Sequence, residues 1–137
     1  MAGLVHLLSC AALAVAAAAP AHAAEDPIGR LRWRSRVVVA LAPTRDDPAL
    51  ARQRRLFAAL GPEGGERDLV LVEAPEDTPD GAALHRRFGA GGGFTAILVG
   101  KDGGEKLRSA APLGRETLFP VIDAMPMRRR EVTPLRR

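Results

Sequence analysis

The distribution of apolar residues along the chain predicts alternating strands and helices. The segment Arg36 to Leu41 contains a continuous β-branched and apolar run, which is typical of a strand buried on both faces. Two further apolar runs predict strands, and the turn residues Lys101-Asp102-Gly103-Gly104 predict a hairpin that leads into a fourth. The four predicted strands are Arg36–Leu41, Leu69–Val72, Phe94–Val99 and Glu105–Ser109.

Helical spacing of apolar residues predicts three helices with characteristic residues at their ends. Asp46-Asp47-Pro48 supplies an N-cap and a proline at the first helical position, and Gly61-Pro62 ends the same helix. Pro120 lies inside the last helix and predicts a kink or a late start there, and Pro126 ends it. The predicted helices cover about 48–60, 82–88 and about 115–125, with a polar loop over 75–80.

The resulting order is β-α-β-α-β-β-α. The first two strands, joined through a helix, should be parallel with a right-handed crossover. A hairpin and a closing helix then follow. This is the thioredoxin-like plan, so we expect an α/β fold with a four-stranded mixed sheet flanked by helices.

The N-terminal segment predicts export. Residues 1–23 contain no Lys, Arg, Asp or Glu, and an apolar stretch from Leu4 to Ala19 is followed by small residues at Ala21 and Ala23. This pattern indicates a signal peptide cleaved after Ala23, followed by a domain over 24–131 and a basic tail over 132–137. The apolar run is too short to favour a membrane span. Leu7 to Cys10 also resembles a lipobox, which leaves lipidation of Cys10 as the alternative. The mature protein is expected to be periplasmic or extracellular.

Composition limits the stabilising bonds and the classes of partner that we expect. Cys10 is the only cysteine, so the chain after Ala23 must be stable without a disulfide. The net charge is +4, and the segment from Met125 to Arg137 alone holds five Arg and one Glu. The basic residues do not interleave with aromatic ones, so we predict no nucleic-acid partner. The expected partner is an unknown protein or an envelope component.

Four stretches are similar to the family called domain of unknown function 4174, over about residues 30 to 131. They are Trp33–Arg36, Glu66–Val72, Val99–Lys106 and Ile122–Arg128. The resemblance implies a thioredoxin-like fold, mostly in exported bacterial proteins, and it implies no established activity.

Thioredoxin chemistry is excluded by the residues themselves. The place of the Cys-x-x-Cys motif after the first strand holds Thr44-Arg45-Asp46-Asp47. Gly93-Phe94 stands where a cis-proline normally precedes the third strand. Ligands of thioredoxin-like proteins meet these loops, so the first candidate binding face contains Arg45, Asp46, Asp47, Gly93 and Phe94.

Little else in the chain suggests catalysis. His85 is the only histidine after Ala23, and we expect it to be a solvated helix residue. No catalytic residue, cofactor or metal site is predicted. One alternative is an enzyme of unfamiliar type that uses Asp46, Asp47, Lys101 or Asp102.

The C-terminal segment is the second candidate surface. Met125 and Met127 resemble the Met-x-Met units that hold Cu(I), so weak Cu(I) binding is another alternative. Packing of Met125 on the core, with Met127 at the sheet edge or on a partner, is favoured. Arg128, Arg129 and Arg130 are predicted to follow a helix C-terminus, where the helix dipole stabilises cations, and they could also attach to an anionic surface. Trp33 is expected to pack at the core edge. The favoured hypothesis is an exported, non-catalytic, thioredoxin-like binding or accessory domain without thiol redox activity.

Overall fold

The computed structural model describes residues 26–133, and its centre is a four-stranded sheet in the order β2-β1-β3-β4. Strand β1 pairs in parallel with β2 and antiparallel with β3, which pairs antiparallel with β4. The strands are β1 (Arg36–Ala42), β2 (Leu69–Pro75), β3 (Thr95–Val99) and β4 (Glu105–Ser109). This confirms the predicted α/β, thioredoxin-like arrangement with a mixed sheet.

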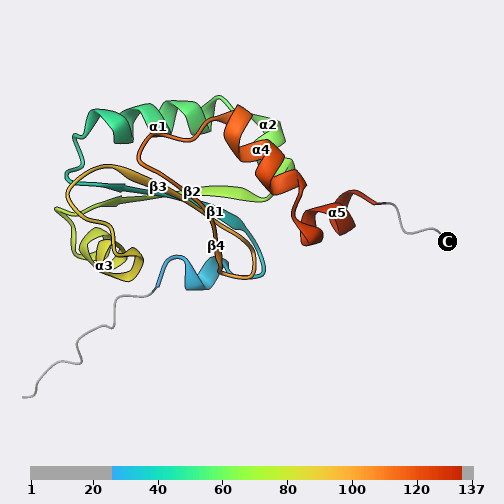
Figure 1. The fold of residues 1–137 in the computed structure, drawn as a ribbon, viewed down its shortest axis with the longest axis horizontal. Helices are drawn as coiled ribbons and strands as arrows, with labels where there is room; N and C mark the ends of the chain where they lie inside the picture. The colour runs from blue at the N-terminus through green and yellow to red at the C-terminus, as the bar shows by residue number, and fades with distance from the viewer. Residues whose placement is uncertain (1–25, 134–137) are drawn as a thin grey trace, which may run out of the picture.

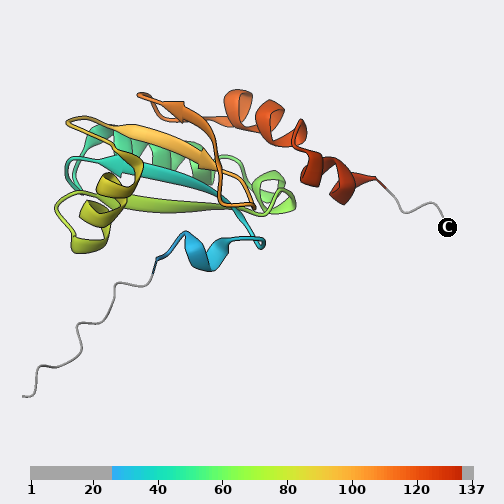
Figure 2. The same ribbon diagram turned by 60° about the horizontal axis from the view of Figure 1, so that its bottom comes forward.

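Helices flank both faces of the sheet. The helical segments are η1 (Gly29–Leu31), α1 (Pro48–Ala58), α2 (Pro62–Glu66), α3 (Pro79–Phe88), α4 (Arg115–Asp123) and α5 (Pro126–Val132). Helices α1 and α4 cover one face, whereas α3 and η1 cover the other (Figure 1). Helix α5 lies beyond the end of α4, at one end of the molecule (Figure 2).

Alternation along the strands divides the core in two. Val38 and Leu98 face α1 and α4, where they pack with Leu118 and Ile122. Their neighbours in the same strands face the opposite way, toward α3 and η1. That second cluster contains Ile28, Val37, Val39, Leu41, Ala74, Leu84, Ile97 and Val99. Every residue of β1 is buried, as its apolar run predicted.

Several predicted boundaries were wrong. Strand β2 continues to Pro75, and α3 begins at Pro79 rather than at Ala82. Helix α4 starts at Arg115 and includes Pro120, so the alternative of a late start was wrong. Pro62 and Pro126 each begin a short helix that was not predicted.

Four polar side chains are buried within residues 26–133, and two of them, Gln53 and His85, tie helices to the rest of the fold. The Gln53 amide donates from Nε2 to the Leu113 carbonyl at 2.9 Å and accepts from the Leu113 N–H at 2.7 Å. It thereby joins α1 to the segment before α4. His85 was predicted to be solvated and is instead buried, because its Nε2 bonds the Ala74 carbonyl at 2.9 Å. That bond ties α3 to β2.

The predicted signal peptide over 1–23, Cys10 and the last four residues of the basic tail lie outside the described residues. Within residues 26–133, no helix is long and apolar enough to cross a membrane.

Candidate functional site

The first candidate face lies where β1 ends, and two of its residues, Asp47 and Phe94, have structural roles. Asp47 caps α1, since its carboxylate accepts from the N–H groups of Ala49 and Leu50 at 2.8 and 3.3 Å. Phe94 packs on the small cluster that contains Leu50. Arg45 pairs with Asp77 at 3.3 Å, and both side chains are at least one-third exposed. An exposed pair of this kind contributes little. Asp46 is exposed as well.

The opposite end of β1 buries two cations. Arg36, the first residue of β1, has only 1% of its side chain exposed. Its Nη1 and Nη2 donate to the two carboxylate oxygens of Glu131, each at 3.2 Å, and Nη1 also donates to the Arg67 carbonyl at 2.9 Å. Its Nε is buried and has no hydrogen-bond partner. A buried unsatisfied donor costs about 1–3 kcal/mol, so this nitrogen is a place where an acceptor would bind favourably.

Lys101, in the turn between β3 and β4, lies beside the same carboxylate. Its Nζ donates to Glu131 at 2.6 Å and to Asp68 at 2.7 Å. Burial lowers the pKa of Lys101, but its bonds to Asp68 and Glu131 outweigh burial and raise that pKa overall. Burial raises the pKa of Glu131, but the bonds from Lys101 and Arg36 together outweigh burial, so the pKa of Glu131 is lowered overall. Both groups therefore remain charged at neutral pH.

Arg67 and Arg128 form further ion pairs around the group of Arg36, Lys101 and Glu131. Arg67 donates to both oxygens of Asp123, at 3.0 and 2.8 Å, and its guanidinium lies 3.8 Å from the centre of the Phe119 ring. Arg128 donates to the Glu66 carbonyl at 2.8 Å and lies 3.6 Å from Glu131. The bond from Arg67 lowers the pKa of Asp123. These contacts join α2, α4 and α5.

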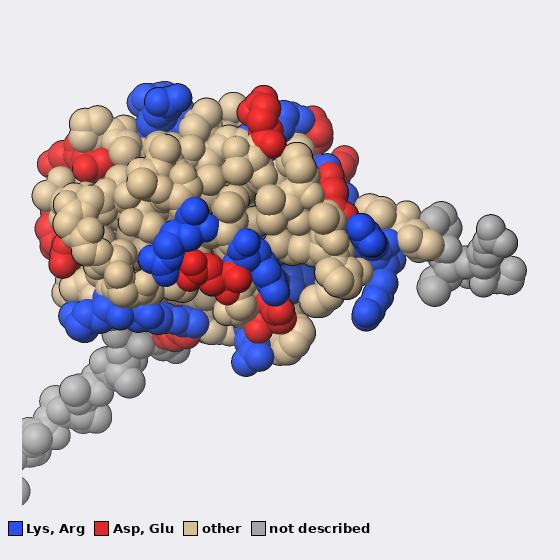
Figure 3. Space-filling view, in the orientation of Figure 1, with Lys and Arg blue, Asp and Glu red and all other residues tan. Residues whose placement is uncertain are grey.

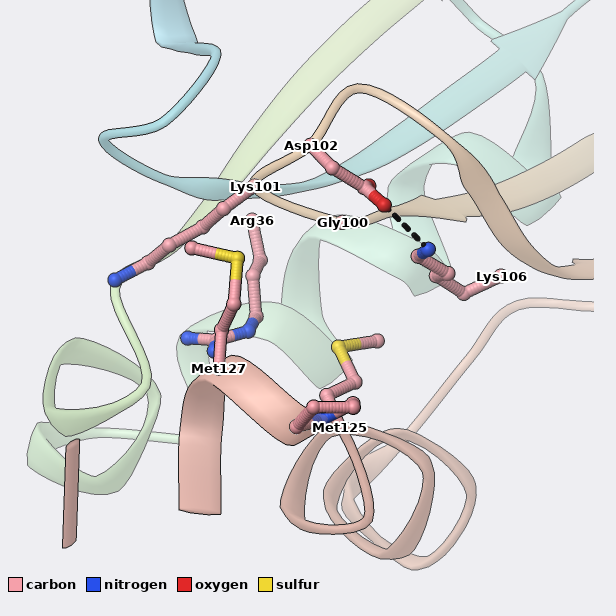
Figure 4. Close-up of a pocket in the computed structure, with 8 residues that line it drawn as sticks. Arg36, Gly100, Lys101, Asp102, Lys106, Met125 and Met127 are labelled. Atoms are coloured by element: carbon pink, nitrogen blue, oxygen red, sulfur yellow. Dashed lines mark hydrogen bonds and ion pairs between the residues drawn. The ribbon is translucent and has the colours of Figure 1, made fainter. Parts of the chain in front are cut away.

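A half-open cavity of about 150 Å³ adjoins the buried cations. It is lined by Arg36, Gly100, Lys101, Asp102, Lys106, Met125, Pro126 and Met127. The Arg36 side chain runs down between Met127 and Met125, while Asp102 and Lys106 form the opposite wall (Figure 4). Lys106 is paired with Asp102 at 2.8 Å. One wall of the cavity is therefore apolar and the others carry mainly positive charge.

The backbone is strained beside Lys101. Trp33 and Asp68 are the non-glycine residues with positive φ within residues 26–133, at 67° and 50°. Both contact Lys101, since the Trp33 N–H donates to its carbonyl at 2.6 Å and the Asp68 carboxylate accepts from its Nζ. A bulky residue such as tryptophan rarely adopts this conformation, and such strain collects at functional sites. Trp33 is also 60% exposed, so the expectation that it packs at the core edge was wrong.

Some residues of the predicted C-terminal surface face the domain, and others are exposed to solvent. Met125, Met127 and Arg128 face the body of the domain, and the two methionines line the cavity. Arg129 and Arg130 are exposed. The three arginines lie inside α5, so the prediction that they follow the C-terminus of the final helix was wrong, although Arg129 and Arg130 do occupy the last turn of α5.

Sequence reasoning did not identify Arg36, Lys106 or Glu131 as site residues. The four stretches that carry the family resemblance do meet around the cavity, because they contain Arg36, Asp68, Lys101 and the two methionines. A cation directly before a run of valines was the sequence signal that could have drawn attention to Arg36.

The face seen in Figure 3 carries no large basic patch. Lys and Arg side chains interleave with Asp and Glu over the face seen in Figure 3. Within residues 26–133, no group of three His, Cys, Asp or Glu side chains could hold a metal ion.

Comparisons with known proteins address the fold and the family. A family model described as "Domain of unknown function (DUF4174)" matches residues 27–131. A solved structure described as "Structure of a malarial protein" is similar with a TM-score of 0.52 and 18% identity, covering 65% of this chain and 94% of that chain. At that identity the likeness shows the fold alone. No sequence among the curated proteins matches this chain.

Proposed function

This chain belongs to the DUF4174 family, as its sequence predicted, and from that starting point we propose that it is an exported, non-catalytic binding domain. In this proposal it uses a thioredoxin-like scaffold without thiol redox chemistry. It binds its ligand in the cavity at the start of β1, which we call the Arg36 cavity. The residues that define it are Arg36, Lys101, Lys106, Met125 and Met127.

The absence of thiol chemistry follows from the residues. Cys10 is the sole cysteine and lies within the predicted signal peptide, so a chain cleaved after Ala23 has no sulfur nucleophile. Asp47, in the place of the missing motif, is engaged as the N-cap of α1. The loop that supplies chemistry in thioredoxins here stabilises a helix.

The observation that carries the proposal is the Arg36 guanidinium. It is almost completely buried, its two Nη atoms are bonded, and its Nε has no partner. The same side chain lines the cavity, between two methionines (Figure 4). A buried cation with an unused donor beside an accessible cavity is typical of a binding site that holds an anionic or acceptor group.

The two alternatives fit the geometry less well. Lys101 and the Asp46–Asp47 pair lie at opposite ends of β1, which six residue steps make about 20 Å long, so they do not form one catalytic site. The Met125 and Met127 side chains do line one cavity, but Arg36, Lys101 and Lys106 line it too. Three cations in the walls disfavour a Cu(I) ion.

Methionine-methyl NMR tests the proposal directly, because the chain contains only Met1, Met125 and Met127. The protein with 13C-labelled methionine methyl groups would be screened against small metabolites that are anionic, cationic or neutral. We expect at least one compound to shift the Met125 and Met127 signals saturably.

A matched pair of variants on β4 controls the screen. Lys106→Ala removes a cation from the cavity wall, whereas Arg108→Ala removes one that pairs with Glu105 outside it. Binding that Lys106→Ala weakens and Arg108→Ala leaves unchanged supports the site. A complete screen that moves neither methyl signal contradicts the proposed function.

A further inference from the structure

The Arg36 cavity has more hydrogen-bond donors than acceptors. The Arg36 Nε–H is unpartnered. Each lysine ammonium group has three N–H donors. Lys101 uses two of its donors, on Asp68 and Glu131. Lys106 uses one of its donors, on Asp102. The Asp102 carboxylate is already engaged, with Lys106 on one oxygen and the Gly104 N–H on the other. A ligand that satisfies this cavity must therefore supply acceptors.

The charge of the walls favours an anionic acceptor. Arg36, Lys101 and Lys106 line the cavity together with one carboxylate, that of Asp102. Glu131 balances Arg36 and Lys101 from the far side of the guanidinium, through the Nη atoms. No acceptor bonds the Nε side of Arg36, but Nε is covered, so a second carboxylate reaches it only when a neighbouring side chain of the cavity wall moves aside. Each of the three cations is already ion-paired, so a cationic ligand is disfavoured mainly because it brings no acceptor for the Arg36 Nε–H and the spare donors of Lys106.

The remaining wall is apolar. Met125, Pro126 and Met127 supply it, and thioether side chains adapt their shape to small apolar groups. A fully polar anion such as phosphate would leave these side chains without a partner. The ligand therefore combines an anionic end with an apolar body.

The volume limits the size of that body. The cavity measures about 150 Å³, and a cavity of about this size in another protein holds benzene, a molecule of about six carbon atoms. After the three heavy atoms of a carboxylate, there is room for roughly three to five further carbons, since the mouth of the cavity is open.

We infer that the Arg36 cavity binds a small organic monocarboxylate with a short apolar chain. The inference rests on the proposed function and names its ligand class. The ligand carboxylate accepts from the Arg36 Nε–H and from Lys106, and its chain lies along Met125 and Met127. Lys101 stays bonded to Asp68 and Glu131 and contributes charge.

Four probes of similar size separate the ligand classes: pentanoate, pentylamine, pentan-1-ol and inorganic phosphate. Each is titrated into the methionine-labelled protein. Pentanoate is expected to shift both the Met125 and the Met127 methyl signals saturably, and the other three are expected to bind at least about tenfold more weakly, the cost of losing one charged hydrogen bond.

Variants locate the carboxylate. Lys106→Ala is expected to weaken pentanoate binding by about tenfold, and Arg108→Ala to leave it within about twofold. Arg36→Lys keeps the charge and removes the Nε–H donor geometry, so it should abolish binding. Far-ultraviolet circular dichroism reports whether that variant is folded. Lys106→Ala provides the test if it is not.

The outcomes separate the inference from the proposed function. If phosphate, the amine or the alcohol shifts the methyl signals and pentanoate does not, the carboxylate inference is wrong and the binding function stands. Equal binding of pentanoate to the wild type and to Lys106→Ala also overturns the inference. If neither the probes nor the metabolite screen moves the two signals, water alone satisfies Arg36, and both proposals fail.

Discussion

Arg36 opens a strand of valines, and its side chain is the largest that the described part of the chain buries completely. Buried ion pairs often contribute no more stability than well-packed apolar side chains of similar volume. The stability of the fold therefore gives little reason for Arg36, Lys101 and Glu131 to meet at this end of β1. The proposed ligand binding gives a better reason for this arrangement, because a preorganised guanidinium recognises a carboxylate with defined geometry.

At the same scale, Gln53 is a structural residue whose importance can be measured. Gln53→Leu keeps the volume similar but leaves the buried N–H and carbonyl of Leu113 without their partners. We expect the free energy of unfolding to fall by about 1–3 kcal/mol. Urea unfolding followed by far-ultraviolet circular dichroism measures this change.

The control for Gln53 is its neighbour Arg52, which is exposed on the same helix. Arg52→Ala should change the free energy of unfolding by no more than about 0.5 kcal/mol. Equal stability of Gln53→Leu and the wild type would show that the amide pair contributes nothing net.

At the scale of elements, α2 and α5 were not predicted because each begins with a proline. Helices α1, α2, α3 and α5 each have a proline in their first turn. Proline ends one helix and suits the start of the next, since its missing N–H is not needed there. Pro62 and Pro126 were interpreted only as terminators. The sequence pattern around them permits both roles, and packing decides between them.

Helix α5 depends on charge for its attachment, because none of its residues is fully buried. Glu131 faces Arg36, Lys101 and Arg128, and Lys101 in turn faces Asp68. The pKa of Glu131 is lowered from its ordinary value of 4.5, so its contribution to stability is present above pH 4.5 and is lost as the pH falls through the lowered value. The pKa of Lys101 is raised from 10.5, so its contribution is present below pH 10.5 and is lost as the pH rises through the raised value.

We therefore expect acid to release α5 before the sheet unfolds. Amide hydrogen exchange, corrected for the intrinsic effect of pH, should show α5 losing protection only as the pH falls below 4.5, while β1 keeps its own. Asp123 also loses its charge in acid, below pH 3.8, since its pKa is lowered from that value mainly by the hydrogen bond from Arg67. A Glu131→Gln variant separates the two groups, because its α5 should already be unprotected at neutral pH. Full protection of α5 in that variant would contradict the assigned role of Glu131.

For the whole molecule, the two ends of β1 have different roles. The end that carries the active site in thioredoxins holds a capped helix and exposed ion pairs, and the opposite end holds the Arg36 cavity and both strained non-glycine residues. A site at the end opposite the usual one is consistent with a scaffold that supports many functions.

The proposed export concerns the whole chain, and the N-terminus of the secreted product tests it. Mass spectrometry of protein recovered from the periplasm or medium of an expressing bacterium should give a chain that begins at Ala24. A chain that begins at a lipid-modified Cys10 would instead support the lipobox alternative. Retention of the intact chain in the cytoplasm would contradict export.

The sequence by itself determined the strands, their order along the chain, the thioredoxin-like class and the absence of cysteine from residues 26–133. These properties depend on local patterns, namely apolar runs, turn residues and the position of the one cysteine. Only the tertiary structure decided which of the candidate residues meet. Arg36, Lys101 and Glu131 are separated by 30 residues or more, and the ion pairs form because the pairing of β1 with β3 and the path of α5 bring one end of each segment together. A charged residue in a single sequence does not show whether its partner is water or another side chain, so neither the burial of Arg36 nor the cavity beside it could be predicted from the sequence.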